Sequence, residues 1–346
     1  MQPPSRRTFL ALGLITLTTA CTGTDGTDAA TKAPAPDPDA PVRLRAVAAT
    51  DTLLSAYDAL LGTPGARTAL LQPLRAETAQ HRAALAQGIP AGSGTPTPGA
   101  PTTAPSTSAA LATLERQTAQ SHLADLDAAR PPLARLLASI AAANALHATT
   151  LGAPPDQPDP ATTPIPSPSA TAPSATSPGT ALPALQQALS AEHAAVYGYG
   201  VVGAHLPDDQ QRADARTYYA AHQAQRDAWQ RLLTTLGTTP TPAAGGYQLP
   251  FPVTDAPTAT KLAAHLETRL TTVYADLVAD LPTPHRRTAA TALRDCTLRA
   301  QHWGAPPPPR RGRPPPPPPR APPPPPRGGP APPPPPPPPR GPPPPP

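Results

Sequence analysis

The sequence predicts an all-α protein that contains two four-helix bundles, each with a long crossover connection between its second and third helices. Two observations lead to this fold class. Apolar residues recur at steps of three and four in eight stretches of the chain, which is the spacing of one face of a helix. The breaks between these stretches are rich in Gly and Pro, and within each group of four they follow the order short, long, short.

The composition limits how much of the chain can fold. Of the 346 residues, 62 are proline, and aromatic residues make up only 3%. Any core must therefore be built from Leu, Ala, Val and a few Tyr. The net charge is +5, but the segment 305–346 carries six arginines and no acidic residue, so the remainder is close to neutral. A near-neutral body with a basic proline tail does not predict a nucleic-acid partner.

Residues 1–21 predict an export signal that ends in a lipidated cysteine. Two adjacent arginines precede an apolar run that is too short to span a bilayer as a permanent helix. This pattern resembles a twin-arginine signal, and the residues before Cys21 resemble a lipoprotein cleavage box. We expect the lipid on Cys21 to hold the exported protein at the outer face of the cytoplasmic membrane, with residues 22–41 as a disordered tether. The alternative is a plain secretory signal in which this cysteine is there by chance.

Residues 42–152 predict the first bundle. Gly62 and Pro64 end its first helix, and Gly88 and Pro90 end its second. Two adjacent prolines suit the first turn of its fourth helix. The seams of the four helices contain, in order, Val47, Leu54 and Leu61; Leu70, Leu74, His81 and Leu85; Leu111, Leu114 and Thr118; and Leu133, Leu136, Ile140, Asn144, His147 and Leu151.

Residues 153–180 predict a disordered linker, and residues 181–304 predict the second bundle. Its first helix runs from about Pro183 to Leu206, and its seam has one acidic member, Glu192, which is costly to bury unless it is paired, protonated or bound to a metal. The four seams contain, in order, Leu185, Leu189, Glu192, Val196, Tyr199, Gly203 and Leu206; Tyr218, His222, Gln225, Trp229, Leu232 and Leu236; Leu266, Leu270, Val273, Leu277 and Leu281; and Ala289, Leu293, Cys296, Ala300 and Trp303.

The long break in each bundle sets the topology. An extended segment of about twenty residues reaches roughly 60 Å, whereas a helix of about 23 residues is only about 35 Å long. The break can therefore run the whole length of the bundle and start the third helix parallel to the second. A four-helix bundle with one such crossover is the ferritin-like arrangement.

Four runs in the second bundle carry a resemblance to a known family. They lie at 191–200 (AEHAAVYGYG), 219–227 (YAAHQAQRD), 249–255 (LPFPVTD) and 274–277 (YADL). Through them, segment 182–304 resembles the DUF4439-type ferritin-like domain family of unknown function, found in exported bacterial lipoproteins. The resemblance implies architecture more than chemistry, because that family has no settled activity. The first bundle looks like a more diverged copy of the same kind.

A di-iron bundle takes a glutamate from each of two helices and Glu-x-x-His from each of the other two. Counting from the turns brings Glu192 and His222 to one height, together with either Glu267 or Leu270 on the third helix. The other positions hold Gln225, Cys296 and Arg299 instead of the required ligands. We therefore predict an internally satisfied polar core, in which Glu192 pairs with Arg299 and accepts a hydrogen bond from His222. A metal site at the same level is the alternative. The candidate residues here are Glu192, His222, Glu267 and Arg299.

The first bundle offers a second candidate set. Glu77 and His81 share a helix face, and His147 follows Asn144 at the i, i+3 spacing. The candidate metal ligands are Glu77, His81, His122 and His147. Zinc would suit so many imidazoles at least as well as iron. The alternative is a set of hydrogen-bonded core histidines.

Three classes of function remain open. The leading one is a non-catalytic, envelope-anchored ferritin-like lipoprotein with no cofactor and a structural or partner-binding role. The second is a metal-binding or redox enzyme of the di-iron type that uses iron or zinc, and the third is an exported binder of a small ligand. The expected partner is the membrane, through the lipid on Cys21, and the sequence does not indicate which protein partner would bind. The tail 305–346 is expected to be disordered polyproline, either a low-complexity extension or a basic spacer that contacts anionic lipid.

Overall fold

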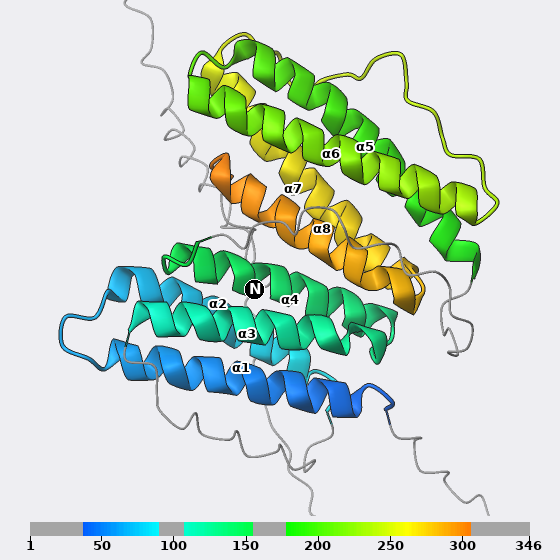
Figure 1. Ribbon diagram of the computed structural model, residues 1–346. Coiled ribbons are helices and arrows are strands. Elements are labelled where there is room, and N and C mark those ends of the chain that lie inside the picture. The colour runs from blue at the N-terminus through cyan, green and yellow to red at the C-terminus, as the bar shows by residue number, and fades with distance from the viewer. Residues whose placement is uncertain (1–36, 90–106, 155–177, 306–346) are drawn as a thin grey trace, which may run out of the picture.

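The computed structural model describes residues 37–89, 107–154 and 178–305. These residues form eight α-helices and one short 3-10 helix, with no strand among them, which confirms the predicted all-α class (Figure 1). The α-helices are α1 (Ala40–Leu61), α2 (Thr68–Ala86), α3 (Ser108–Ala124), α4 (Pro131–Thr150), α5 (Pro178–His205), α6 (Asp209–Thr235), α7 (Ala256–Asp280) and α8 (Thr283–His302).

Local sequence signals set several helix ends. At the start of α6 the Asp208 side chain accepts a hydrogen bond from the Gln211 amide at 2.8 Å, and Gly237, with φ of 73°, follows the end of that helix. Asp255 and Thr258 form a reciprocal capping box at the start of α7. Polar side chains thus satisfy backbone groups that the helix itself leaves unpaired.

Two helices begin earlier than the sequence predicts. α1 begins at Ala40, inside the predicted tether 22–41, and α5 begins at Pro178, inside the predicted linker 153–180. A proline is compatible with the first turn of a helix, so Pro41 does not mark a boundary. The predicted export signal, most of the predicted tether and linker, and the tail from residue 306 lie outside the described residues.

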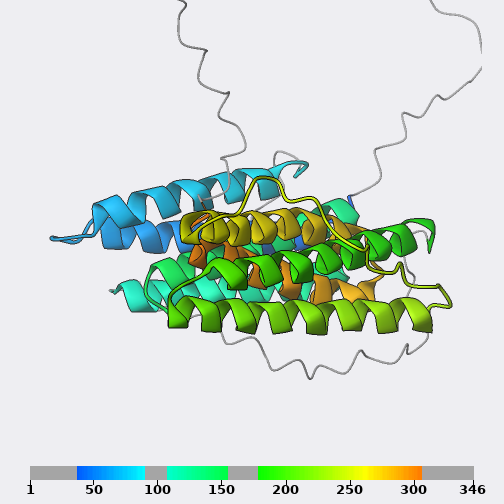
Figure 2. The same ribbon diagram turned by 90° about the horizontal axis from the view of Figure 1, so that it is seen from above.

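The helices lie in layers. α1, α2 and α3 are on one side of the molecule, α5 and α6 are on the other, and α4, α7 and α8 lie between them (Figure 1). The helices run lengthwise beside one another when the molecule is seen from above (Figure 2). α4 packs against α3 on one side and against α7 and α8 on the other. The largest apolar cluster is therefore continuous from Val42 and Leu133 through Tyr274 and Leu293.

Arg286 joins the first half of the structure, residues 37–154, to the second half, residues 178–305. Its guanidinium is buried and donates to the carbonyls of Leu126 at 3.1 Å and Ala129 at 2.6 Å, both in the first half. It also donates to the carbonyl of Leu281 at 3.0 Å, just before its own helix. One side chain thus satisfies three carbonyls where the halves meet.

The connection between α6 and α7 contains no helix and runs along the outside of the molecule (Figure 1). The Gln186 side chain holds one end, because it donates to the Thr239 carbonyl and accepts from the Thr241 amide, both at 2.8 Å. At the other end Phe251 packs edge-on against His265, with ring centroids 6.2 Å apart. Contacts at both ends therefore fix the path of this long segment.

None of the helices in the described residues is long and apolar enough to cross a membrane.

Candidate functional site

The centre of the second half is an imidazole held between two carboxylates. Glu192 comes from α5, His222 from α6 and Glu267 from α7, and none of the three is more than 1% exposed. His222 Nδ1 lies 2.8 Å from Glu192 Oε2, and His222 Nε2 lies 3.1 Å from Glu267 Oε1. His222 therefore contacts both glutamates directly, and Glu267 is the third-helix residue that reaches it.

Two Tyr–Trp pairs complete this network. The Tyr199 hydroxyl donates to Glu267 Oε1 at 2.6 Å and accepts from Trp303 Nε1 at 2.9 Å. On the opposite side, the Tyr274 hydroxyl donates to Glu192 Oε1 and accepts from Trp229 Nε1. Each tyrosine follows a glutamate of its own helix by seven residues, so both lie on the same helix face, and each donates to the glutamate of the other helix.

Protonation of His222 offsets part of the carboxylate charge in this network. Burial alone lowers the pKa of His222, but the two neighbouring glutamates outweigh burial and raise that pKa to about 9. Burial alone raises the pKa of Glu267, and His222 more than offsets this, so the pKa ends below its usual value. Burial first, and then the adjacent carboxylates, raise the pKa values of Tyr199 and Tyr274 well above normal. At neutral pH an imidazolium therefore neutralises buried carboxylate charge, while both phenols stay protonated.

The predicted ion pair between Arg299 and Glu192 is wrong. His222 and Tyr274 already occupy the two oxygens of Glu192. The Arg299 guanidinium lies instead over the Tyr218 ring, 5.3 Å from its centroid, which is a cation–π contact. Although burial opposes it, the charge of Glu267 raises the pKa of Arg299, so the arginine contributes to the field around that glutamate without bonding to Glu192.

Cys296 is also part of this core, but it is not an activated nucleophile. It is buried, and burial followed by the charge of Glu267 raises the pKa of the thiol well above its usual value. A reactive cysteine needs the opposite shift and access from solvent.

The first half has a network of its own around Glu115, which is fully buried on α3. Glu115 Oε1 accepts from the Tyr57 hydroxyl at 2.6 Å, and Oε2 accepts from Asn144 Nδ2 at 2.7 Å. His147 Nδ1 lies 3.2 Å from the same carboxylate. Two other helices of this half supply these partners, because Tyr57 lies on α1 and both Asn144 and His147 lie on α4.

Glu115 is absent from the residues that the sequence identifies, yet a signal for it exists. It follows Leu111 by four positions and precedes Thr118 by three, so it lies on the seam of its own helix. A search for acidic residues on every seam would have found it together with Glu192.

The predicted set Glu77, His81, His122 and His147 is only partly brought together. His147 Nε2 lies 3.4 Å from Glu77 Oε2, and His81 Nε2 lies 3.9 Å from Glu77 Oε1. The His81 and His147 rings stack with centroids 6.1 Å apart. His122 is buried on α3, and neither of its ring nitrogens has a hydrogen-bond partner among the described residues.

The histidines of this half differ in protonation. Burial opposes a proton on His147, but hydrogen bonds to Glu115 and Glu77 prevail and raise its pKa to about 9. Burial, followed by the charge of His147, lowers the pKa of His81 to about 4. Burial likewise lowers the pKa of His122 to about 4. One charged imidazole thus stands beside two neutral ones.

Iron and zinc do not fit these residues as they are arranged. Both ring nitrogens of His222 face carboxylates, and His147 carries a proton at neutral pH, so neither offers a free lone pair. Across the part of the chain that the structure describes, no group of three or more His, Cys, Asp or Glu side chains could hold a metal ion. The arrangement can hold and distribute charge inside the protein.

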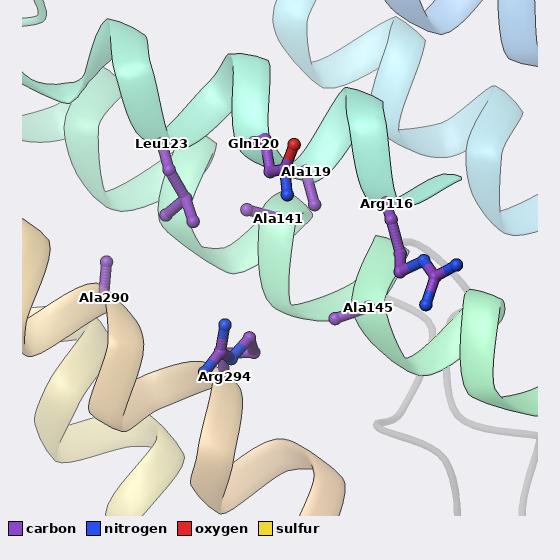
Figure 3. A pocket seen from close by; sticks show the side chains of 8 residues that line it. All are labelled: Arg116, Ala119, Gln120, Leu123, Ala141, Ala145, Ala290 and Arg294. Carbon is purple, nitrogen blue, oxygen red and sulfur yellow. The ribbon is translucent and has the colours of Figure 1, made fainter. Parts of the chain in front are cut away.

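Two cavities are also present, and the second of them borders Tyr199. One, of about 40 Å³, is enclosed where α3, α4 and α8 meet, and the Arg294 side chain points toward it (Figure 3). It has room for only a few water molecules, and Arg294 is already bound to Asp295 at 2.9 Å. The other, of about 260 Å³, is an open groove between α5 and α6.

Among the described residues, the fold and these networks define an all-helical protein whose buried carboxylates contact buried imidazoles. The chain belongs to the family described as "Domain of unknown function (DUF4439)", whose model matches residues 184–313. Among solved structures it is similar to a conserved hypothetical protein, rv2844, from Mycobacterium tuberculosis. The identity is 33%, the match covers 37% of this chain and 97% of that one, and the TM-score is 0.36. No curated protein matches the chain.

Proposed function

We propose that this protein is a non-catalytic lipoprotein of the cell envelope with a structural or partner-binding role. In this proposal the lipid on Cys21 holds it at the outer face of the cytoplasmic membrane, and its helices form two ferritin-like bundles whose di-metal sites have degenerated. The observation that carries the proposal is the position of His222, whose two ring nitrogens contact Glu192 and Glu267 at 2.8 and 3.1 Å.

The argument rests on charge compensation. In a di-iron bundle, glutamates from two helices face metal ions, and Glu-x-x-His pairs from the other two complete the set of ligands. Here an imidazolium lies between the two glutamates, and Gln225, Cys296 and Arg299 stand where the paired ligands would be. The protein itself therefore supplies the positive charge that metals would otherwise supply.

The absence of access from solvent supports a non-catalytic role. Glu192, His222, Glu267 and both hydrogen-bonded tyrosines are at most 2% exposed. A general acid or base must come within hydrogen-bond reach of its substrate. Groups packed this tightly between helices stabilise one arrangement of the helices, which is the requirement for a binding or structural module.

The ferritin-like topology draws support from the connection between α6 and α7. It contains no helix and is held at both ends, so it has the length and the path of a crossover.

Metal analysis of the purified full chain tests the loss of the di-metal site. The chain is expressed with iron or zinc supplied, dialysed without chelator and measured by plasma mass spectrometry. We expect much less than one metal per chain, with the same result for Glu192→Gln. Stoichiometric metal that disappears in Glu192→Gln or His147→Ala would overturn the proposal and favour a metal-binding or redox enzyme.

Membrane anchoring needs a separate experiment. We expect the wild-type chain in the membrane fraction and Cys21→Ser in the soluble exported fraction. Equal distribution of the two would mean that this cysteine carries no anchor.

A further inference from the structure

The groove between α5 and α6 has features that folding does not require. Its α5 wall contains two glycines, Gly200 and Gly203, and its α6 wall contains Arg216 and Tyr219. The buried ring of Tyr199, which belongs to the Glu267 network, lies at its base. At about 260 Å³, the groove is slightly smaller than most pockets for drug-sized ligands.

The two glycines cannot be explained by conformation or packing. Both lie inside a helix, and neither is among the described glycines with positive φ. A Cβ atom built on either one would meet nothing within 4 Å. Gly198 in the same helix is different, because its Cβ would come within 2.6 Å of Leu266 on α7. Glycine in a helix is unfavourable compared with alanine, so two glycines that open onto one groove point to an occupant that approaches the α5 backbone closely.

The α6 wall presents unused donors. Within the described residues, neither the Arg216 guanidinium nor the Tyr219 hydroxyl has a hydrogen-bond or ion-pair partner. Arg212, by contrast, is fixed by the carbonyls of Leu206 and Pro207 at 3.0 and 2.8 Å.

Nearby acidic side chains do not neutralise Arg216. Asp208 caps α6, Asp209 pairs with Arg212, and Asp214 binds His302 at 3.0 Å. The groove therefore combines an apolar, side-chain-free wall with a positive charge and a hydroxyl donor.

We propose that this groove binds a small organic anion, a carboxylate or phosphate attached to a flat apolar body. The anionic group meets Arg216 and Tyr219, and the flat body lies against the backbone of α5 at Gly200 and Gly203. This inference does not depend on the anchoring or on the missing metal site.

The probes are benzoate and phenyl phosphate, with benzyl alcohol as the neutral match. Binding to the full chain is measured by saturation-transfer NMR and by quenching of tryptophan fluorescence. Trp303 can report on the groove because it donates a hydrogen bond to Tyr199, which lines the groove. We expect saturable binding of at least one anion, with a dissociation constant on the order of 1 mM for so small a ligand, and much weaker binding of benzyl alcohol.

Three variants locate the site. Arg216→Ala removes a charge-assisted contact and should weaken anion binding roughly ten-fold. Gly203→Leu fills the groove and should abolish binding. Arg231→Ala, an exposed arginine further along α6, is the matched control and should bind like wild type. Thermal melting of each variant shows that the fold is retained.

The proposal fails if neither anion binds saturably, or if Arg216→Ala binds both as wild type does. Sedimentation velocity covers the competing occupant, a second copy of the chain. Self-association that disappears in Gly203→Leu would mean that a protein surface fills the groove, and the small-anion assignment would then be wrong.

Discussion

Tyr57 and Tyr199 make the same contact in the two halves of the protein. Each donates its hydroxyl, at 2.6 Å, to a buried glutamate two helices further along the chain, Glu115 for the first and Glu267 for the second. The residues that follow also match, because Asn144 lies 29 positions after Glu115, as Cys296 does after Glu267. Both halves therefore have a buried Tyr–Glu pair. In the first half the glutamate also contacts Asn144 and His147, whereas in the second half it contacts His222, which also contacts Glu192.

Removing either hydroxyl should destabilise the protein, and the second-half change should cost more. Tyr57→Phe leaves one oxygen of a buried carboxylate with one donor fewer, at a cost of about 1–3 kcal/mol. Tyr199→Phe does the same and also removes the acceptor of Trp303, so its loss should be larger. Urea unfolding measures both. Tyr197→Phe, at a site 41% exposed, is the control and should change little; equal stability of all three variants would contradict the assignment.

Loss of the central imidazole should be the most damaging single change. His222→Ala leaves Glu192 and Glu267 buried without their shared cation, and breaking a buried ion pair typically costs about 3–5 kcal/mol. The measurement is the free energy of unfolding in urea at pH 7. Arg231→Ala removes an exposed side chain of the same helix and should stay within about 0.5 kcal/mol of wild type. A mild effect of His222→Ala would show that the two glutamates are neutralised by other means.

Stability should fall as the pH rises from neutral. The pKa values of His147 and His222 are raised to about 9 in the folded protein, against about 6.5 for an unfolded histidine. Between these values the folded chain retains protons that the unfolded chain has released. The free energy of unfolding should therefore drop with pH across this window, by up to about 1.4 kcal/mol per pH unit for each group.

Stability should also fall on the acid side. Burial lowers the pKa values of His81 and His122 to about 4, so between pH 6.5 and 4 the unfolded chain binds protons that the folded chain excludes. The maximum should lie near the pKa of free histidine. Urea titrations from pH 5 to 9.5 test both limbs, and His222→Gln should flatten the alkaline one. A flat profile above pH 6.5 would rule out the buried imidazolium ions.

Arg286→Ala should loosen the contact between the halves. It removes hydrogen bonds to three carbonyls, two of them in the first half, and leaves those carbonyls buried. We expect a loss of about 2–4 kcal/mol and a thermal transition that broadens or splits when followed by calorimetry. Arg287→Ala, at the exposed neighbouring position, should retain a single sharp transition. If both variants melt alike, Arg286 does not couple the halves.

The helices could be predicted from the sequence because steps of three and four define a buried face without any tertiary information. Counting along those faces also gave the common height of Glu192 and His222, and left Glu267 and Leu270 as the two candidates on the third helix. Height does not determine which side chain reaches which carboxylate oxygen. The sequence predicts Arg299 as the partner of Glu192, but the Tyr274 hydroxyl, two helical turns beyond Glu267, makes that contact. The sequence predicts Tyr199 and Trp303 only as core residues. Their position on a buried face does not indicate that the Tyr199 hydroxyl donates to Glu267 or that the Trp303 indole N–H donates to Tyr199. The packing of α4 against α7 and α8 joins residues far apart in sequence, which no local pattern encodes.

The central position of α4 has a consequence for any attempt to divide this molecule. One side of that helix belongs to the interior of the first half, and the other covers α7 and α8. Cutting the chain between residues 154 and 178 would expose an apolar surface to solvent on each fragment. Such pieces should stick to one another or precipitate, so the matched DUF4439 segment is better studied with its N-terminal companion attached.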